Sequence, residues 1–167
     1  MLIDNILDSA ISYNGSDVKR INHLLKVFSF AHHIGIMEQC DAEIQTIIDI
    51  SALLHDIGIH EAERKHNSSA GNWQEIEGPP VAQELLKGFH LDDAIKERIL
   101  FLIGHHHHYK IIDDIDFQIL VEADFLVNIF EDEMDEHSIE NIKEKIFKTK
   151  TGIQLLEKLY INKKSPP

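Results

Sequence analysis

Histidine and aspartate residues interrupt several apolar segments of this chain. His55 and Asp56 directly follow the run "SALL", His105 and His106 follow "FLIG", and Asp124 lies inside "ILVEADFLV". Imidazole and carboxylate groups are costly to bury one at a time, and a divalent cation is the commonest way to satisfy several of them together. The pattern therefore predicts a metal centre built from segments that are far apart in the sequence.

Amphipathic helices are the elements expected to position these residues. Apolar side chains recur every three to four positions over residues 17–34, which predicts a helix that carries His23 and is capped by Asp17. A second helix is predicted over residues 41–54, with His55 and Asp56 at its end and Gly58 terminating the segment. His23 thereby joins the set of candidate ligands.

Helical periodicity continues through most of the remaining chain. It is visible in segments 81–89, 92–106 and 117–130, and more weakly in 138–147 and 152–160, while alternating strand patterns do not stand out. Residues 59–80 are polar, contain Gly and Pro, and are predicted to form mostly a loop that could cover a substrate. The expected fold is all-α, a helical bundle in one domain spanning 1–167, with a core at about 17–130 and C-terminal helices within 138–161.

The order of the motifs resembles that of the HD superfamily of metal-dependent phosphohydrolases. The resemblance rests on His23, the segment "LLHDIG" and the segment "ILVEAD", each on a predicted helix, and it covers roughly residues 17–130. It implies a helical bundle with a metal site between its helices. It also implies that the metal ligands are His23, His55, Asp56 and Asp124.

Some HD proteins hold two metals, and the HD-GYP phosphodiesterases add a pair of histidines that ends a helix. The segment "FLIGHH" resembles that position and selects His105 and His106 as further ligands. An earlier histidine of the family pattern is replaced here by Glu77, which is either a ligand through its carboxylate or an ordinary acid near a helix start. No "GYP" tripeptide follows the His-Asp pair, so a cyclic dinucleotide substrate is not implied.

The expected activity is hydrolysis of a small phosphate ester or nucleotide by a water that a divalent metal activates. The expected cofactor is one or two divalent ions of Fe, Mn, Zn or Mg. If there are two, the carboxylate of Asp56 is the ligand able to bridge them. Arg64 is the candidate for clamping the phosphate, since arginine can donate two parallel hydrogen bonds, although it could equally be a solvated loop residue. His106 is the candidate proton donor to the leaving oxygen when it is not bound to metal.

Two other classes of function remain open. Some HD-fold proteins hold two irons and oxidise a C–H bond with dioxygen, and a site rich in histidine and carboxylate is compatible with iron. Such an oxygenase would need oxygen for turnover, whereas a hydrolase would not. A binding module that has kept the bundle but lost catalysis would lack metal ligands, yet all four expected ligands are present.

The composition of the chain limits the classes of partner that it is expected to bind. There are 16 Lys and Arg against 29 Asp and Glu, a formal net charge of -13, so nucleic acid is not an expected partner and a small phosphorylated molecule is. The single cysteine, the absence of a signal-peptide pattern and the lack of a run of about 20 apolar residues predict a cytoplasmic protein with no membrane segment. A homo-oligomer is compatible with the sequence, and the end, "NKKSPP", is expected to fray.

Overall fold

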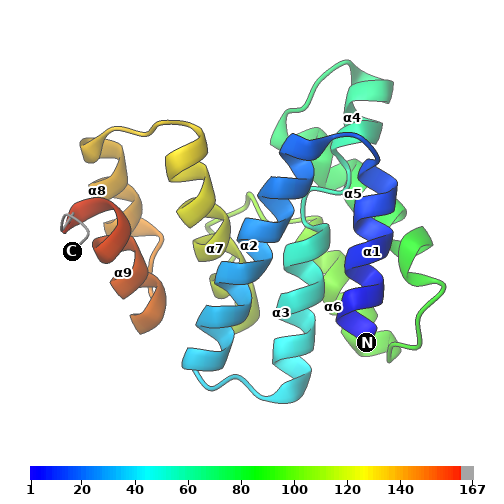
Figure 1. Cartoon of the computed structure of the whole chain (residues 1–167), viewed down its shortest axis with the longest axis horizontal. Helices are drawn as coiled ribbons and strands as arrows, with labels where there is room; N and C mark the ends of the chain where they lie inside the picture. The colour runs from blue at the N-terminus through cyan, green and yellow to red at the C-terminus, as the bar shows by residue number, and fades with distance from the viewer. Residues whose placement is uncertain (163–167) are drawn as a thin grey trace.

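The computed structural model describes residues 1–162, and within that range every regular element is a helix (Figure 1). The elements are α1 (Leu2–Asn14), α2 (Val18–Met37), α3 (Ala42–Leu54), α4 (Ile59–His66), α5 (Gly71–Leu86), α6 (Asp93–Ile103), α7 (Ile115–Glu131), α8 (Glu136–Lys145), α9 (Lys150–Leu156) and a terminal π-helical turn, η1 (Glu157–Ile161). The all-α prediction is confirmed. The tail that was expected to fray, residues 163–167, lies outside the described residues.

Helices α2, α3 and α7 form the centre of the bundle, because α2 packs against both α3 and α7 and these two also touch each other. Helices α1 and α6 pack on α3, and α5 packs against both α6 and α4. Helices α8 and α9 lie on the opposite side of the molecule, next to α7 (Figure 1). Fully buried side chains fill the space between the central helices, among them Ile34, Ile48, Leu53, Phe117 and Leu120.

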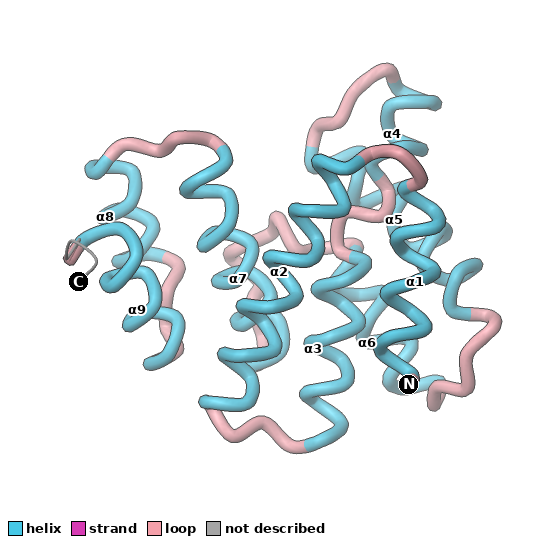
Figure 2. The backbone as a smooth tube through the Cα atoms, viewed as in Figure 1, coloured by secondary structure: helices cyan, strands magenta, loops and turns pink. Residues whose placement is uncertain are grey.

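The helix starts follow local sequence chemistry. The carboxylate of Asp17 accepts a hydrogen bond from the backbone N–H of Arg20, and that of Asp41 accepts from Glu43 and Ile44. The predicted cap at Asp17 is therefore present, and Asp41 caps α3 in the same way. Short connections join most helices, as the tube in Figure 2 shows.

The prediction of a loop over residues 59–80 was wrong, because α4 and most of α5 lie there. Helix α4 has only eight residues and is mostly polar, so its apolar face is marked by just two buried residues, Ile59 and Ala62, and helix α4 packs on α5. The consecutive residues Pro79 and Pro80 suggest a break, but they lie inside α5. Each removes one backbone donor, and the packing of α5 on α4 and α6 outweighs that loss. The N-terminal helix α1 was not predicted either.

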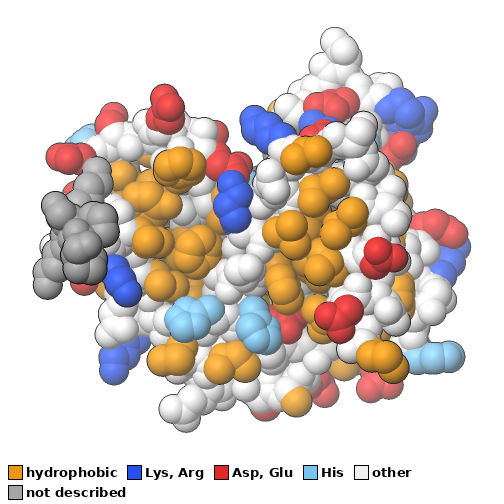
Figure 3. Space-filling view, in the orientation of Figure 1, with side chains coloured by type: hydrophobic (Ala, Val, Ile, Leu, Met, Phe, Trp, Pro, Cys, Tyr) orange, Lys and Arg blue, Asp and Glu red, His pale blue; other side chains and the backbone are white. Residues whose placement is uncertain are grey.

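The surface has both apolar and charged regions. On the face drawn in Figure 3, hydrophobic side chains gather over α1 and its neighbours and again toward the C-terminal helices, with acidic side chains scattered around them. No helix among residues 1–162 combines the length and hydropathy that crossing a bilayer requires.

Candidate metal centre

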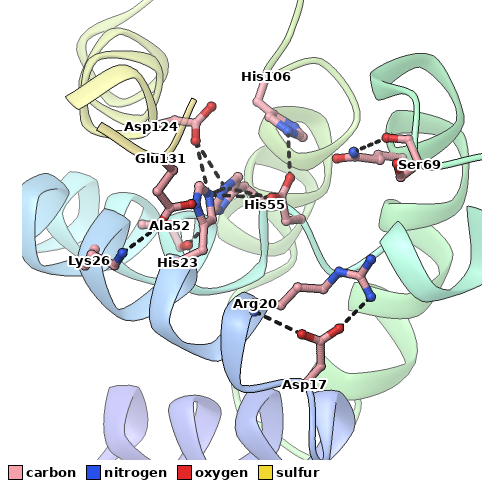
Figure 4. A network of polar contacts seen from close by, with 12 residues as sticks. Asp17, Arg20, His23, Lys26, Ala52, His55, Ser69, His106, Asp124 and Glu131 are labelled. Carbon is pink, nitrogen blue, oxygen red and sulfur yellow. Dashed lines mark hydrogen bonds and ion pairs between the residues drawn. The ribbon is translucent and has the colours of Figure 1, made fainter. Parts of the chain in front are cut away.

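Four side chains from different parts of the chain converge at the centre of the bundle. His23 comes from α2, His55 from the turn after α3, and Asp124 from α7 (Figure 4). Asp56 follows His55 in the same turn. The Nε2 atoms of His23 and His55 are 3.2 Å apart, and Asp124 Oδ1 lies 3.3 Å from the former and 3.6 Å from the latter. Asp56 Oδ2 is 3.6 Å from His23 Nε2 and 3.5 Å from His55 Nε2.

These separations match the geometry of a metal's coordination shell. With metal–ligand bonds of about 2.0–2.2 Å, neighbouring ligand atoms lie roughly 2.8–3.1 Å apart in octahedral sites and roughly 3.3–3.6 Å apart in tetrahedral sites. The ligand atoms of His23, His55 and Asp56 all fall within 4.8 Å of one another. The residues present thus fit a divalent cation.

The two histidines are oriented so that their Nε2 atoms face the cluster. His55 Nδ1 is 2.9 Å from the carbonyl oxygen of Ala52, and His23 Nδ1 is 3.0 Å from Glu131 Oε2. An acceptor at Nδ1 favours the tautomer with its proton there, which leaves the Nε2 lone pair free for a metal. Both side chains are buried, so their rotamers are held by packing as well.

Neighbouring charges stabilise the ionised forms of the aspartates and His55 in this cluster. Burial would raise the pKa values of Asp56 and Asp124, but the adjacent imidazoles keep the pKa of both carboxyls well below their usual range. Burial would lower the pKa of His55, yet the Asp56 and Asp124 carboxylates raise it to about 9. Without a metal, protons on the histidines balance the two carboxylates, and a divalent cation would take over that role.

A second group of ligand atoms shares Asp56. His106 Nε2 lies 3.4 Å from Asp56 Oδ1, and His107 completes a group within 4.8 Å. His106 Nε2 and His107 Nδ1 are buried and have no hydrogen-bond partner among the described residues, while His106 Nδ1 is 2.9 Å from the carbonyl oxygen of Ile103. Burial and His106 lower the pKa of His107 to about 4, so this imidazole is neutral at pH 7 and available to a metal.

The structure does not bring the predicted ligand His105 into either group. Its Nδ1 is 2.7 Å from the carbonyl oxygen of Phe101, and its ring stacks on the Phe101 ring at a centroid distance of 4.3 Å. Helix α6 ends at Ile103, and the turn that follows Gly104 aims His106 and His107 inward instead. The sequence indicated a pair of inward histidines, but the pair is displaced by one residue, and His107 was missed.

Glu77 also lies outside both groups. Its carboxylate faces α4, where Lys65 Nζ is 2.5 Å from Oε2 and His66 Nε2 is 2.9 Å from Oε1. Hydrogen bonds from Lys65 and His66 lower the pKa of Glu77. The geometry supports an ion-pair role between α4 and α5, in place of the predicted metal ligation.

Arg64 is similarly engaged elsewhere. Its guanidinium donates to Glu61 at 2.7 and 3.0 Å, and its side chain is 65% exposed. The structure instead places Arg20 and Lys19 in a cleft of about 460 Å³ that His23 and Asp56 also line. Arg20 could have been identified from its spacing, since it precedes His23 by three residues and shares that helix face.

Comparison with solved structures identifies the fold. The chain resembles a predicted HD superfamily hydrolase from an uncultured Thermotogales bacterium, with a TM-score of 0.61 and 22% sequence identity over 91% of this chain and 81% of that chain. No family model and no curated protein matches the sequence. The chain thus shares the fold of that solved structure, and within this fold the His-Asp cluster forms a candidate metal centre.

Proposed function

We propose that the protein is a metal-dependent phosphohydrolase that acts on a small phosphate ester or nucleotide. The observation that carries this proposal is the convergence of His23, His55, Asp56 and Asp124, at mutual distances suited to a single cation, beside a cleft that also contains Arg20. The HD superfamily fold supports it, since the structural relative is itself described as a predicted hydrolase of that superfamily.

Each part of the site has a role in this reaction. A bound divalent cation would neutralise phosphate oxygens and lower the pKa of a water molecule, so that it attacks phosphorus near neutral pH. Asp56 and Asp124 supply the negative charge that retains a cation, and His23 and His55 supply neutral nitrogen donors. His106, buried next to Asp56, acts in this scheme as a ligand in preference to a proton donor.

Arg20 is the residue best placed to bind a phosphate group. Asp17 and Glu63 hold its terminal nitrogens at 2.7 and 2.6 Å, and His60 Nδ1 lies 3.2 Å from one of them. These contacts fix the guanidinium in the cleft without using its Nε–H, which leaves a donor for an anion. Asp17 and Glu63 offset the charge of the guanidinium, so a bound cation would supply the net positive charge that attracts a phosphate, and Arg20 would orient it.

Phosphate release tests the proposal directly. Protein loaded separately with Mn²⁺, Zn²⁺, Mg²⁺ or Fe²⁺ would be incubated without oxygen with nucleoside mono- and triphosphates, p-nitrophenyl phosphate and bis-p-nitrophenyl phosphate. We expect metal-dependent release from at least one class and none from the matched Asp56→Ala protein. Equal release by the two proteins, or none with any metal, would contradict the proposal.

A two-iron oxygenase is the second candidate. The observation in its favour is that Asp56 belongs to both ligand groups, as a carboxylate bridging two irons would. Parallel incubations of the iron-loaded protein with dioxygen separate the candidates, because an oxygenase turns over only with iron and dioxygen. Oxygen consumption together with failure to hydrolyse any ester would favour it.

A further inference from the structure

Helix α7 contacts both nitrogens of the His23 ring. Asp124 Oδ1 lies 3.3 Å from Nε2, and Glu131 Oε2 lies 3.0 Å from Nδ1. Seven residues separate the two acids, which is two helical turns, so they project from the same face of α7. Lys26, three residues after His23 on α2, donates to the other Glu131 oxygen at 2.5 Å.

The position of Glu131 is unfavourable for the helix itself. It is the last residue of α7, whose last turn holds no basic residue, and a negative charge there opposes the helix dipole. Its side chain is also only 18% exposed. Local helix chemistry therefore does not account for a glutamate here, whereas its contact with His23 does.

His23 differs in this respect from the other imidazoles of the centre. His55 and His106 present their Nδ1 atoms to backbone carbonyls, which are neutral acceptors. His23 alone among these three has a carboxylate at Nδ1. An anionic acceptor fixes the tautomer more strongly and makes the opposite nitrogen a better metal donor.

We propose that Glu131 is a positioning residue that holds the His23 ring for metal binding, with Lys26 fixing the Glu131 carboxylate in place. This inference rests on the metal centre of the proposed function, but it does not depend on the substrate. Outer partners of this kind commonly contribute about 10- to 100-fold to metal affinity. Glu131 acts through His23 and needs no contact with the cation.

Asp132 provides a matched control. It follows Glu131 directly, lines the same cleft and is exposed, and it makes no hydrogen bond or ion pair with His23. Asp132→Asn removes the same unit of negative charge from nearly the same place. A purely electrostatic effect of Glu131 would thus be reproduced by the Asp132 variant.

The test is Mn²⁺ binding to chelator-stripped protein, followed by the electron paramagnetic resonance signal of free Mn²⁺, together with the melting temperature of each metal-free variant. We expect the dissociation constant to rise about tenfold in Glu131→Gln, which keeps the size and an acceptor, and further toward a hundredfold in Glu131→Ala. Asp132→Asn should stay within about twofold. The metal-free melting temperature should fall slightly in Glu131→Gln, which loses the ion pair with Lys26 but keeps an acceptor for His23, and more in Glu131→Ala.

Other results would overturn the inference in distinguishable ways. Equal losses of Mn²⁺ affinity in Glu131→Gln and Asp132→Asn would show that Glu131 acts only through its negative charge and not through its contact with His23. Unchanged affinity with a lower metal-free melting temperature would make its role purely structural. A wild-type protein that binds neither Mn²⁺ nor any other divalent ion would remove the metal centre itself, whereas Mn²⁺ binding with no phosphate release would affect the proposed substrate alone.

Discussion

The Nε2 atoms of His23 and His55 face each other at 3.2 Å in a buried setting. Two bare nitrogens at this distance would leave their lone pairs opposed, so the contact requires a proton or a cation between them. The adjacent carboxylates of Asp56 and Asp124 supply the balancing charge. This relationship links the histidine pattern of the sequence to the metal centre.

Asp56 should be the least replaceable residue of the site. Its Oδ2 faces His23 and His55, and its Oδ1 faces His106. We predict that Asp56→Ala abolishes metal retention and phosphate release, measured by element analysis and by turnover of the purified protein. Asp132→Asn is the control for loss of charge, and a metal-loaded, active Asp56→Ala protein would end the assignment.

The helical fold could be predicted because its central elements are long and rich in apolar residues. Those of α2 recur every three to four positions, whereas α3 and α7 carry consecutive buried residues, as helices at the centre of a bundle do. The caps Asp17 and Asp41 precede their helices directly. Helix α4 could not be recognised in this way. It has eight residues, of which only Ile59 and Ala62 are buried and apolar, so too few positions mark its apolar face. Contacts with α5 and the Arg64–Glu61 pair hold it in place.

The site could be predicted only in part, for a similar reason. Motif order indicated which residues meet, and the structure does bring His23, His55, Asp56 and Asp124 together. The inward pair of the histidine run depends on where α6 ends, and helix ends are poorly determined by sequence. The partners of Glu77 depend on how α4 lies against α5, which no local pattern records.

Arg20 should outweigh Arg64 in substrate binding. Both guanidinium groups are paired with carboxylates, but Arg20 lines the cleft with His23 and Asp56, whereas Arg64 is largely exposed outside it. We predict that Arg20→Ala raises the KM for a phosphate substrate about tenfold, the ~1.4 kcal/mol scale of one charged hydrogen bond. Arg64→Ala is the control with the same change of charge, and its KM should be unchanged. The reverse order of effects would restore the role first predicted for Arg64.

Gly58 should be required for the close packing of the His-Asp turn on α5. A Cβ atom at Gly58 would lie 2.5 Å from the Gln74 carbonyl oxygen and 2.5 Å from the Gly78 nitrogen, and neither backbone atom can move freely. We predict that Gly58→Ala lowers the free energy of unfolding by about 1–3 kcal/mol and the melting temperature by several degrees.

The control for this substitution is Gly88→Ala. Gly88 is exposed, and an added Cβ there would meet nothing within 4 Å, so its melting temperature should not fall. Because Gly58 follows Asp56 by two residues, metal content should also drop in Gly58→Ala. Equal melting temperatures for the two variants would show that the turn can shift without cost.

Metal stoichiometry should distinguish two neighbouring histidines. His106 faces Asp56, and its buried Nε2 lacks a hydrogen-bond partner among the described residues, whereas His105 stacks on Phe101. We predict nearly two metal atoms per chain in protein purified without oxygen, about one in His106→Ala, and still nearly two in His105→Ala. Element analysis of the three proteins measures this difference. One metal atom per chain in all three would leave a single-metal centre at His23, His55, Asp56 and Asp124. Loss of a metal atom in His105→Ala alone would show that His105, as first predicted, is a ligand of the second site.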